Sequence, residues 1–298
     1  MKNMFKNILV LCVMCSSAAS AQIDLLRNQV QQIVTQANGT IGVAFENIET
    51  GDTLSVGGDG RYPMQSVYKF PLALAVLKRV DEGTLSLNQN IFITKKDLRL
   101  KTWSPMREKY PKSDTALSLH EILSFTVSQS DNNGCDVLFR LLGGTNVVHQ
   151  FVHGLGVTDI AIAATEEEMA HEWNVQFRNW CTPLAMRKLI RMFYDGKILS
   201  DTSTSYLLRL LEETTTSPGR LRGLLPLHAI VAHKTGSSGE NAHGVAAATN
   251  DAGIITLPNG QHAILVVFMT NSTANENVRD NVIARIAKSV WKKYEGKR

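Results

Sequence analysis

The sequence contains few cysteines and no cluster of metal-binding side chains. It has four cysteines in 298 residues, and two of them, Cys12 and Cys15, lie close to the N-terminus. Two of the histidines, His233 and His243, flank a motif described below, but they are not placed at ligand spacing. We therefore expect no metal site and no other cofactor.

Long apolar runs and basic stripes are also scarce. Beyond the N-terminal segment, no stretch approaches the roughly 20 apolar residues that span a bilayer. The formal net charge is +4, and no basic stripe with interleaved aromatic side chains occurs, so nucleic acid is not an expected partner. The chain also shows no internal repeat, low-complexity tract or linker.

The first 21 residues have the form of a secretory signal peptide. Lys2 and Lys6 precede an apolar run over residues 8–14, and the small residues Ala19-Ser20-Ala21 form an A-x-A cleavage pattern. We expect cleavage before Gln22, export to the periplasm and no membrane attachment afterwards. Because two lysines leave with this segment, the net charge would fall from +4 to about +2.

The cysteines leave two questions open. A lipoprotein anchor on Cys15 is an alternative to simple cleavage, although Met14 is bulkier than the residue that usually precedes such a cysteine. After export, Cys135 and Cys181 would lie in an oxidising compartment, where a disulfide has to be considered. Cys135 lies in a helical pattern with an apolar face, so we expect a small buried thiol there.

Strand patterns occur near both ends of the chain, and helical patterns lie between them. Short apolar runs predict strands at 41–45, 53–56, 229–232, 244–249 and 263–268. Helical spacing and capping signals predict helices at 24–35, from Ser66 to Gly83, at 118–142 with a break at 130–132, from Thr182, at 203–211 and at 275–294.

These elements predict an α+β fold. Residues 22–60 and 222–298 would form an antiparallel sheet with the terminal helices packed on it, and residues 61–221 a mostly helical domain. Ligand clefts often lie at domain boundaries, so we expect the reactive groups to meet there.

Three short motifs follow one another along the chain: Ser66-Val67-Tyr68-Lys69, Ser130-Asp131-Asn132 and Lys234-Thr235-Gly236. A serine hydroxyl is a weak nucleophile until a base takes its proton. Lys69, three residues after Ser66 at a helix start, lies one turn away on the same face. The first motif alone often occurs by chance, but all three in this order resemble the serine β-lactamases and penicillin-binding proteins.

Over nearly all of its length after the leader, the chain resembles the class A serine β-lactamases, most of all the divergent branch that includes many extended-spectrum enzymes. The resemblance implies hydrolysis of β-lactam antibiotics, and hence resistance, through an acyl-enzyme on Ser66. It implies that Lys69 is the base, or a partner to the base, and that Ser130 relays a proton to the lactam nitrogen. The backbone N–H groups of Ser66 and Ser237 would hold the oxyanion.

The resemblance also implies a set of substrate-binding residues. Asn132 would bind the side-chain amide of the substrate, and Lys234 and Thr235, followed by Gly236, would hold its carboxylate. A solvated lysine at a strand end is the alternative for Lys234. An arginine that often supports carboxylate binding has no match around residues 270–271; Arg220 resembles the substitute used in this branch, and a plain surface arginine is its alternative.

Glu166 would determine whether the acyl-enzyme is hydrolysed, because it would activate water for deacylation. Penicillin-binding proteins lack this step: they are acylated in the same way and then stall. Three consecutive glutamates begin at this position, and the E-x-x-M pattern ending at Met169 favours the first of them. The chain departs from the family pattern at Ala170, which cannot hold the deacylating water. We expect a different water position, assisted by His171.

A second departure affects the restraint of the same loop. The Arg–Asp pair that clips it in many relatives is replaced by Ala164 and Asn179, so the loop would be restrained differently and the pocket would be wider for bulky cephalosporins. A D-alanyl-D-alanine carboxypeptidase or transpeptidase and a β-lactam sensor are the alternative functions. We expect a monomer whose only partners are small β-lactams.

Overall fold

The computed structural model describes residues 21–112 and 114–296. The predicted signal peptide lies outside the described residues, apart from its last residue. No helix in the described part of the chain is long and apolar enough to cross a membrane.

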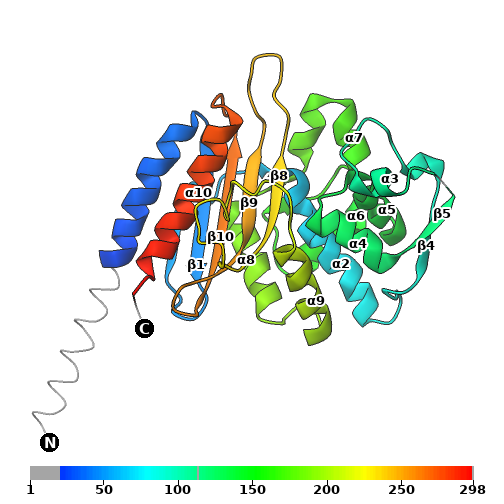
Figure 1. The fold of residues 1–298 in the computed structure, drawn as a ribbon, viewed down its shortest axis with the longest axis horizontal. Helices are drawn as coiled ribbons and strands as arrows, with labels where there is room; N and C mark the ends of the chain where they lie inside the picture. The colour runs from blue at the N-terminus through cyan, green and yellow to red at the C-terminus, as the bar shows by residue number, and fades with distance from the viewer. Residues whose placement is uncertain (1–20, 113, 297–298) are drawn as a thin grey trace, which may run out of the picture.

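A five-stranded antiparallel sheet in the order β2-β1-β10-β9-β8 forms the centre of the fold (Figure 1). Its strands are β1 (Thr40–Asn47), β2 (Thr53–Val56), β8 (Val231–Ser237), β9 (Thr249–Thr256) and β10 (His262–Thr270). Two small sheets accompany it: β3 (Tyr62–Pro63), β7 (Trp180–Cys181) and β6 (Ile160–Ala161) form one, and β4 (Asn90–Ile93) and β5 (Thr115–Ser118) form the other.

Helices cover both faces of the large sheet. The helix over residues 21–34 and α10 (Glu276–Lys293) lie on one face, and the remaining helices lie on the other (Figure 1). These are α2 (Lys69–Asp81), α3 (Pro105–Lys109), α4 (Leu119–Ser128), α5 (Asn132–Leu142), α6 (Thr145–Gly154), α7 (Glu166–His171), α8 (Pro183–Tyr194) and α9 (Asp201–Glu212). Short 3₁₀ turns occur at η1 (Thr35–Ala37), η2 (Gln65–Tyr68), η3 (Lys95–Asp97) and η4 (Trp173–Arg178).

Two apolar cores hold these layers together. One lies between the sheet and the terminal helices, with Val43, Leu265 and Ile286 fully buried in it. The other joins the opposite sheet face to the helical part, from Phe268 on β10 to Leu74 on α2. The α+β prediction is therefore confirmed, and the division at residues 61 and 221 stays a prediction.

The helix-end signals read from the sequence are confirmed. Ser118 and Glu121 form a reciprocal capping box, with hydrogen bonds of 3.2 and 3.3 Å between side chain and backbone. Thr182 caps α8 with Pro183 at its first position, and Gly143 ends α5 with a φ of +96°.

Two element predictions need correction. The alanine-rich run 244–249 was expected to be a strand, but β9 begins only at Thr249. The sequence pattern missed β9 because buried polar side chains, Asn250 and Asp251, lie near its start. Ser66 lies in the 3₁₀ turn η2, and the α-helix α2 begins at Lys69.

Both cysteines in the described part of the chain are buried and free, so Cys135 and Cys181 form no disulfide there. This confirms the buried thiol that the helical pattern around Cys135 predicted.

Candidate active site

Ser66 and Lys69 lie at the junction between η2 and α2, where the sheet meets the helical part. Lys69 is completely buried, and its Nζ donates to Ser66 Oγ at 3.0 Å. Nζ also donates to the backbone oxygen of Ser130 at 2.8 Å and to Asn132 Oδ1 at 2.6 Å. The amino group of one buried lysine thus joins the first two sequence motifs.

The residue before the nucleophile has an unusual backbone. Gln65 has a φ of +48°, a conformation that a side chain other than glycine rarely adopts. Its buried side chain donates to Gln176 Oε1 at 2.5 Å, and Gln176 in turn donates to the Trp173 carbonyl at 2.7 Å. These bonds tie the serine turn to the loop that carries Glu166.

Lys234 reaches the same centre from β8. Its side chain is 1 % exposed, and Nζ donates to Ser130 Oγ at 2.9 Å and to the Thr235 carbonyl at 3.1 Å. Burial, followed by the positive charge of Lys69, holds the pKa of Lys234 well below its usual value. A solvated strand-end lysine is therefore the wrong interpretation.

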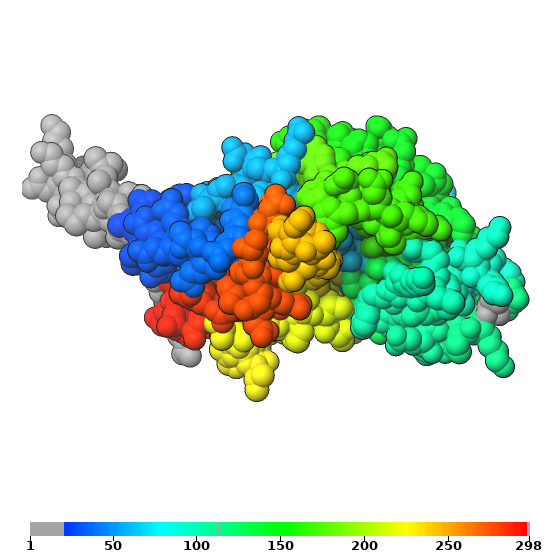
Figure 2. Space-filling model, turned by 90° about the horizontal axis from the view of Figure 1, so that it is seen from above, coloured from blue at the N-terminus to red at the C-terminus, as the bar shows by residue number. Residues whose placement is uncertain are grey.

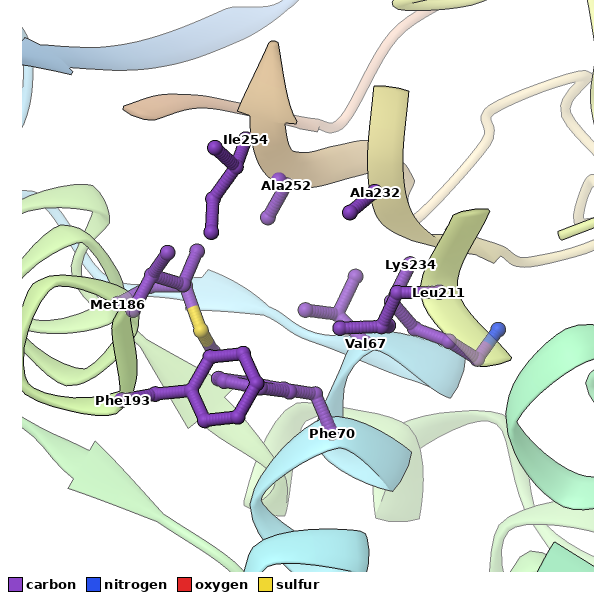
Figure 3. A pocket seen from close by; sticks show the side chains of 11 residues that line it. Val67, Phe70, Met186, Phe193, Leu211, Ala232, Lys234, Ala252 and Ile254 are labelled. Atoms are coloured by element: carbon purple, nitrogen blue, oxygen red, sulfur yellow. The ribbon is translucent and has the colours of Figure 1, made fainter. Parts of the chain in front are cut away.

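The stem of Lys234 lines a small apolar hollow behind the nucleophile. Figure 3 shows that Val67, Phe70 and Leu211 also line this hollow and that the Lys234 nitrogen is directed away from it. These apolar neighbours restrain the stem, and the amino group is held at Ser130 by its hydrogen bond.

The three consecutive glutamates have three different environments. Glu166 is buried at the start of α7, with Oε1 3.0 Å from Lys69 Nζ. Glu167 is exposed, while Glu168 forms a capping box with Thr165. Only the first of the three thus faces the serine–lysine pair.

Asp136 supports the start of α7. Its Oδ1 accepts from the N–H of Glu166 at 2.8 Å, and its Oδ2 accepts from the N–H of Glu167 at 2.9 Å. Arg99 pairs with the same carboxylate at 2.7 Å. Burial, together with the charge of Glu166, raises the pKa of Asp136 from 3.8 to about 6.

A neutral amide clips the loop where the sequence lacks the Arg–Asp pair. Asn179 Oδ1 accepts from the N–H groups of Ala163 at 2.7 Å and Ala164 at 2.9 Å. Its Nδ2 donates back to the Ala164 carbonyl at 2.8 Å, and Asn179 is completely buried. The two ends of the loop, at β6 and β7, are thereby held together without a charge.

The third motif packs directly against the nucleophile turn. A Cβ on Gly236 would lie 2.5 Å from the Met64 carbonyl oxygen and 3.1 Å from the amide nitrogens of Ser66 and Val67. Only glycine allows β8 to approach this closely. The Thr235 hydroxyl lies 2.5 Å from that of Thr216, and Asn132 Nδ2 donates to Thr102 Oγ1 at 2.8 Å.

Arg220 is buried, so the surface-arginine alternative is wrong. Its guanidinium pairs with Asp280 at 2.7 Å and donates to the carbonyls of Gly236 at 3.1 Å and Asn250 at 2.9 Å. Nη2 donates to Ser237 Oγ at 2.7 Å. Arg220 therefore reaches the cleft through the hydroxyl of Ser237.

Two adjoining hollows share Asn132 and Ser237 as walls. One contains Ser66, Ser130 and Thr235, and the other contains Glu166 with residues 169–173, including the exposed Ala170 and His171. The cleft thus places a nucleophile, two buried lysine amino groups and a carboxylate around one space, which suits acyl transfer followed by hydrolysis.

A model of the beta-lactamase enzyme family matches residues 25–294. The chain belongs to this family.

Its relatives and solved neighbours agree with that membership. VEB-1, a beta-lactamase from Pseudomonas aeruginosa, is 47 % identical over 94 % of this chain and 93 % of its own length. The crystal structure of the TLA-3 extended-spectrum beta-lactamase is 50 % identical, with a TM-score of 0.89 over 90 % of this chain and 98 % of that one. A class A beta-lactamase structure from Bacteroides cellulosilyticus is 34 % identical, with a TM-score of 0.87 over 94 % and 99 % of the two chains. The enzyme is a serine β-lactamase of class A.

Sequence reasoning missed several residues around the centre of this β-lactamase. Asp136 lies four residues after Asn132 on α5, so helical spacing alone places it on the same face. Gln65 precedes the nucleophile directly, but its partner Gln176 is more than a hundred residues away and no local pattern joins them. Thr102, which accepts a hydrogen bond from Asn132, belongs to no sequence motif that would single it out.

Proposed function

We propose that the enzyme opens β-lactam rings by acylation of Ser66 and releases the product with water activated by Glu166. The observation that carries the proposal is the position of Lys69 Nζ, 3.0 Å from both Ser66 Oγ and Glu166 Oε1. In acylation the serine proton passes either to Lys69 in its neutral form or, through Lys69, to Glu166, and Ser66 Oγ attacks the lactam carbonyl.

The oxyanion that forms would lie between the N–H groups of Ser66 and Ser237. Each such donor lowers the barrier by about 2.7–4 kcal/mol. The close packing of Gly236 on the serine turn supports this role, because it brings the two segments that carry these N–H groups together. Ser130 then gives its proton to the departing nitrogen, and the ammonium of Lys234 at its oxygen stabilises the charge that develops.

Substrate orientation would use the walls of the same cleft. Asn132 would bind the acylamino group of the substrate, and Lys234 with Thr235 its carboxylate. Arg220 would act on that carboxylate through Ser237, since its own guanidinium is buried. Metal and cofactor have no role in this scheme.

Deacylation would depend on Glu166 as general base toward a water in the second hollow. Ala170 has no side chain able to hold that water, so Glu166 and Asn132, with His171 nearby, would provide the polar surroundings. The hydrolysis of large cephalosporins is included in the proposal, since TLA-3, whose structure resembles this one, is described as an extended-spectrum beta-lactamase.

We also propose export to the periplasm after cleavage before Gln22, with a monomer as the working form and no nucleic-acid partner. The basic, then apolar, then small-residue pattern at the N-terminus supports export. A lipid anchor on Cys15 would instead add mass that electrospray mass spectrometry of the exported protein detects.

Turnover of a chromogenic cephalosporin tests the main proposal. The purified enzyme should hydrolyse a large molar excess at a steady rate. Glu166→Ala should release about one product per enzyme and then stall, with the acyl adduct visible by mass spectrometry. A native enzyme that itself stops after one equivalent would favour the transpeptidase or sensor alternatives.

A further inference from the structure

Lys234 is a buried amino group that has no carboxylate in direct contact. Its side chain is 1 % exposed, and Nζ donates to Ser130 Oγ and to the Thr235 carbonyl. Among the described residues, no carboxylate lies within ion-pair distance of Lys234, whereas Lys69 has Glu166 at 3.0 Å. The proposed function needs a protonated Lys234, because its charge holds the substrate carboxylate and acts at Ser130. An anion that favours this proton has to lie further away.

Asp251 on β9 is a buried carboxylate that the proposed mechanism does not use. It is 0 % exposed, and both of its oxygens lie 2.9 Å from His233 Nδ1. Its Oδ2 also accepts from the N–H of Leu221 at 3.1 Å. An ionised carboxylate only accepts hydrogen bonds, which is what these contacts require. An imidazole can donate through Nδ1 while it is neutral, so these bonds by themselves leave the negative charge of Asp251 uncancelled.

Asp251 and Lys234 lie on neighbouring strands, with their side chains on opposite faces of the sheet. Asp251 pairs with Thr235, and Lys234 pairs with Ala252, so the two are diagonal neighbours. Ala252 belongs to the core on the helical side, whereas Ile255, on the same face of β9 as Asp251, belongs to the core under the terminal helices. The sheet lies between these two parts (Figure 1), and the view from above shows the same order (Figure 2). Since both side chains are buried, sheet backbone rather than bulk water separates them.

The other charged groups near Asp251 already have partners. Arg220, directly before Leu221, pairs with Asp280 of α10 at 2.7 Å. The groups that face Lys234 are the amino group of Lys69 on α2, the carboxylate of Glu166 on α7, the thiol of Cys135 on α5 and the carboxylate of Asp251. Burial raises the pKa of the Cys135 thiol, which keeps it neutral. Burial, followed by the charge of Lys69, lowers the pKa of Lys234, and Asp251 offsets these effects more than Glu166 does.

We propose that Asp251 is the counter-ion that keeps Lys234 protonated during catalysis, acting through the sheet from the face opposite the cleft. This inference rests on the proposed function. Asp251 contacts neither substrate nor reacting atoms and acts only through Lys234, so it is a positioning residue. Two buried charges interact more strongly than two solvated ones, because little water screens them. Removal of the Asp251 charge should therefore make Lys234 easier to deprotonate.

The pH dependence of catalysis tests this role. The native enzyme and Asp251→Asn are compared on benzylpenicillin between about pH 6 and about pH 10. Loss of the Lys234 proton should form the alkaline limb of the kcat/KM profile, and in Asp251→Asn this limb should move to lower pH by about one unit. Above the limb, the variant should have a kcat/KM about tenfold below the native value, with most of the loss in KM. At about pH 6 the two enzymes should agree within about twofold.

Two further measurements separate this role from a structural one. An arginine stays charged throughout this pH range, so Lys234→Arg should have no alkaline limb, and adding Asp251→Asn to it should not create one. Deacylation of a preformed acyl-enzyme depends on Glu166, so its pH dependence should be the same in Asp251→Asn as in the native enzyme. A carboxylate that only supported the fold would slow both steps at every pH.

Matched variants complete the experiment. Glu46→Gln removes another partly buried carboxylate of the same sheet, which pairs with Arg187 and Arg191, and should not move the alkaline limb. His233→Gln keeps a donor that cannot carry a charge, and should not move it either. If Asp251→Asn does not fold, Asp251→Leu combined with His233→Leu replaces both polar groups by apolar ones and should move the limb in the same direction.

Three results would overturn the inference while leaving the proposed function intact. The first is an alkaline limb at the same pH in the native enzyme and in Asp251→Asn. The second is a limb that persists in Lys234→Arg, because another group would then titrate. The third is a limb that moves to higher pH in His233→Gln, because a charged imidazole would then cancel Asp251. A native enzyme that does not turn over benzylpenicillin at any pH would overturn the proposed function instead.

Discussion

At the scale of single residues, the centre is a set of buried ionisable groups that lie close enough to affect one another's pKa values. Lys69 and Lys234 converge on Ser130, one through its backbone oxygen and the other through its hydroxyl. Glu166 faces Lys69, and Asp136 lies beneath the start of α7. Changing any one charge therefore alters the protonation of the others.

Asp136 gives this coupling a measurable pH dependence. Its pKa is raised to about 6 in the folded protein, above its ordinary 3.8, so the folded state holds a proton more tightly than the unfolded state between these values. The free energy of unfolding of the native enzyme, relative to that of Asp136→Asn, should therefore decrease by about 3 kcal/mol as pH rises from about 4 to about 6. Above pH 6 the difference should level off.

Urea unfolding of the native enzyme and Asp136→Asn at several pH values between 4 and 7 measures this difference. The curve of the difference in free energy against pH should slope through that window, whatever the constant offset from altered hydrogen bonds. A difference that does not change with pH would mean that folding does not raise the pKa of Asp136.

Lys234 provides a second prediction at this scale. A buried ammonium carries a desolvation cost that its hydrogen bonds offset only in part, so Lys234→Met should unfold at a higher temperature, with a gain of about 1 kcal/mol or more. Acylation should slow strongly at the same time, because the charge near Ser130 is lost. Calorimetry and stopped-flow acylation report the two effects; a variant that is both destabilised and slow would contradict the trade-off.

At the scale of elements, the loop that carries Glu166 depends on Asn179. Replacing this asparagine by alanine would leave the N–H groups of Ala163 and Ala164 without their side-chain acceptor, which costs about 1–3 kcal/mol for each unsatisfied buried group. Asn179→Ala should therefore lose stability and slow deacylation more than acylation.

Pre-steady-state kinetics separates the two steps for this variant. Asn88→Ala, which changes an exposed asparagine before β4, serves as the matched control and should behave like the native enzyme. Equal slowing of both steps by Asn179→Ala would show that the clip supports the whole site rather than the loop.

Much of the element plan could be predicted from the sequence, because helix ends carry local signals. Ser118, Thr182 and Gly143 each act within one turn of the chain, where periodicity and capping are visible. The start of β9 could not be predicted, because Asn250 is buried through bonds to the carbonyls of Pro63 and Met64, far away in sequence.

Part of the active site could likewise be predicted from the sequence, and part could not. Ser66 and Lys69 are predictable because one helical turn relates them. The link between Gln65 and Gln176, and the clip at Asn179, are contacts across long sequence separations, and only the folded chain brings them together.

At the scale of the whole molecule, one apolar core joins the sheet to the helical part. Phe193 of α8 is fully buried in it and meets Phe70 of α2 edge-on, with ring centroids 5.5 Å apart. Phe193→Ala should destabilise the protein by about 3–5 kcal/mol. Because the core is continuous, tryptophan fluorescence and enzymatic activity should be lost in one common denaturant transition. Two separated transitions would mean that the sheet and helical parts unfold independently.

The contact between Gly236 and the turn before Ser66 has a consequence for how this enzyme can change over generations. No side chain fits at that position, so mutations there are lost before selection can act on substrate range. Residues 242–244, after β8, and residues 170–172, in the Glu166 loop, carry exposed side chains, and replacements at exposed positions usually change stability little. Adaptation to new antibiotics should therefore accumulate in the walls of the cleft, around a reaction centre that is held constant by its own packing.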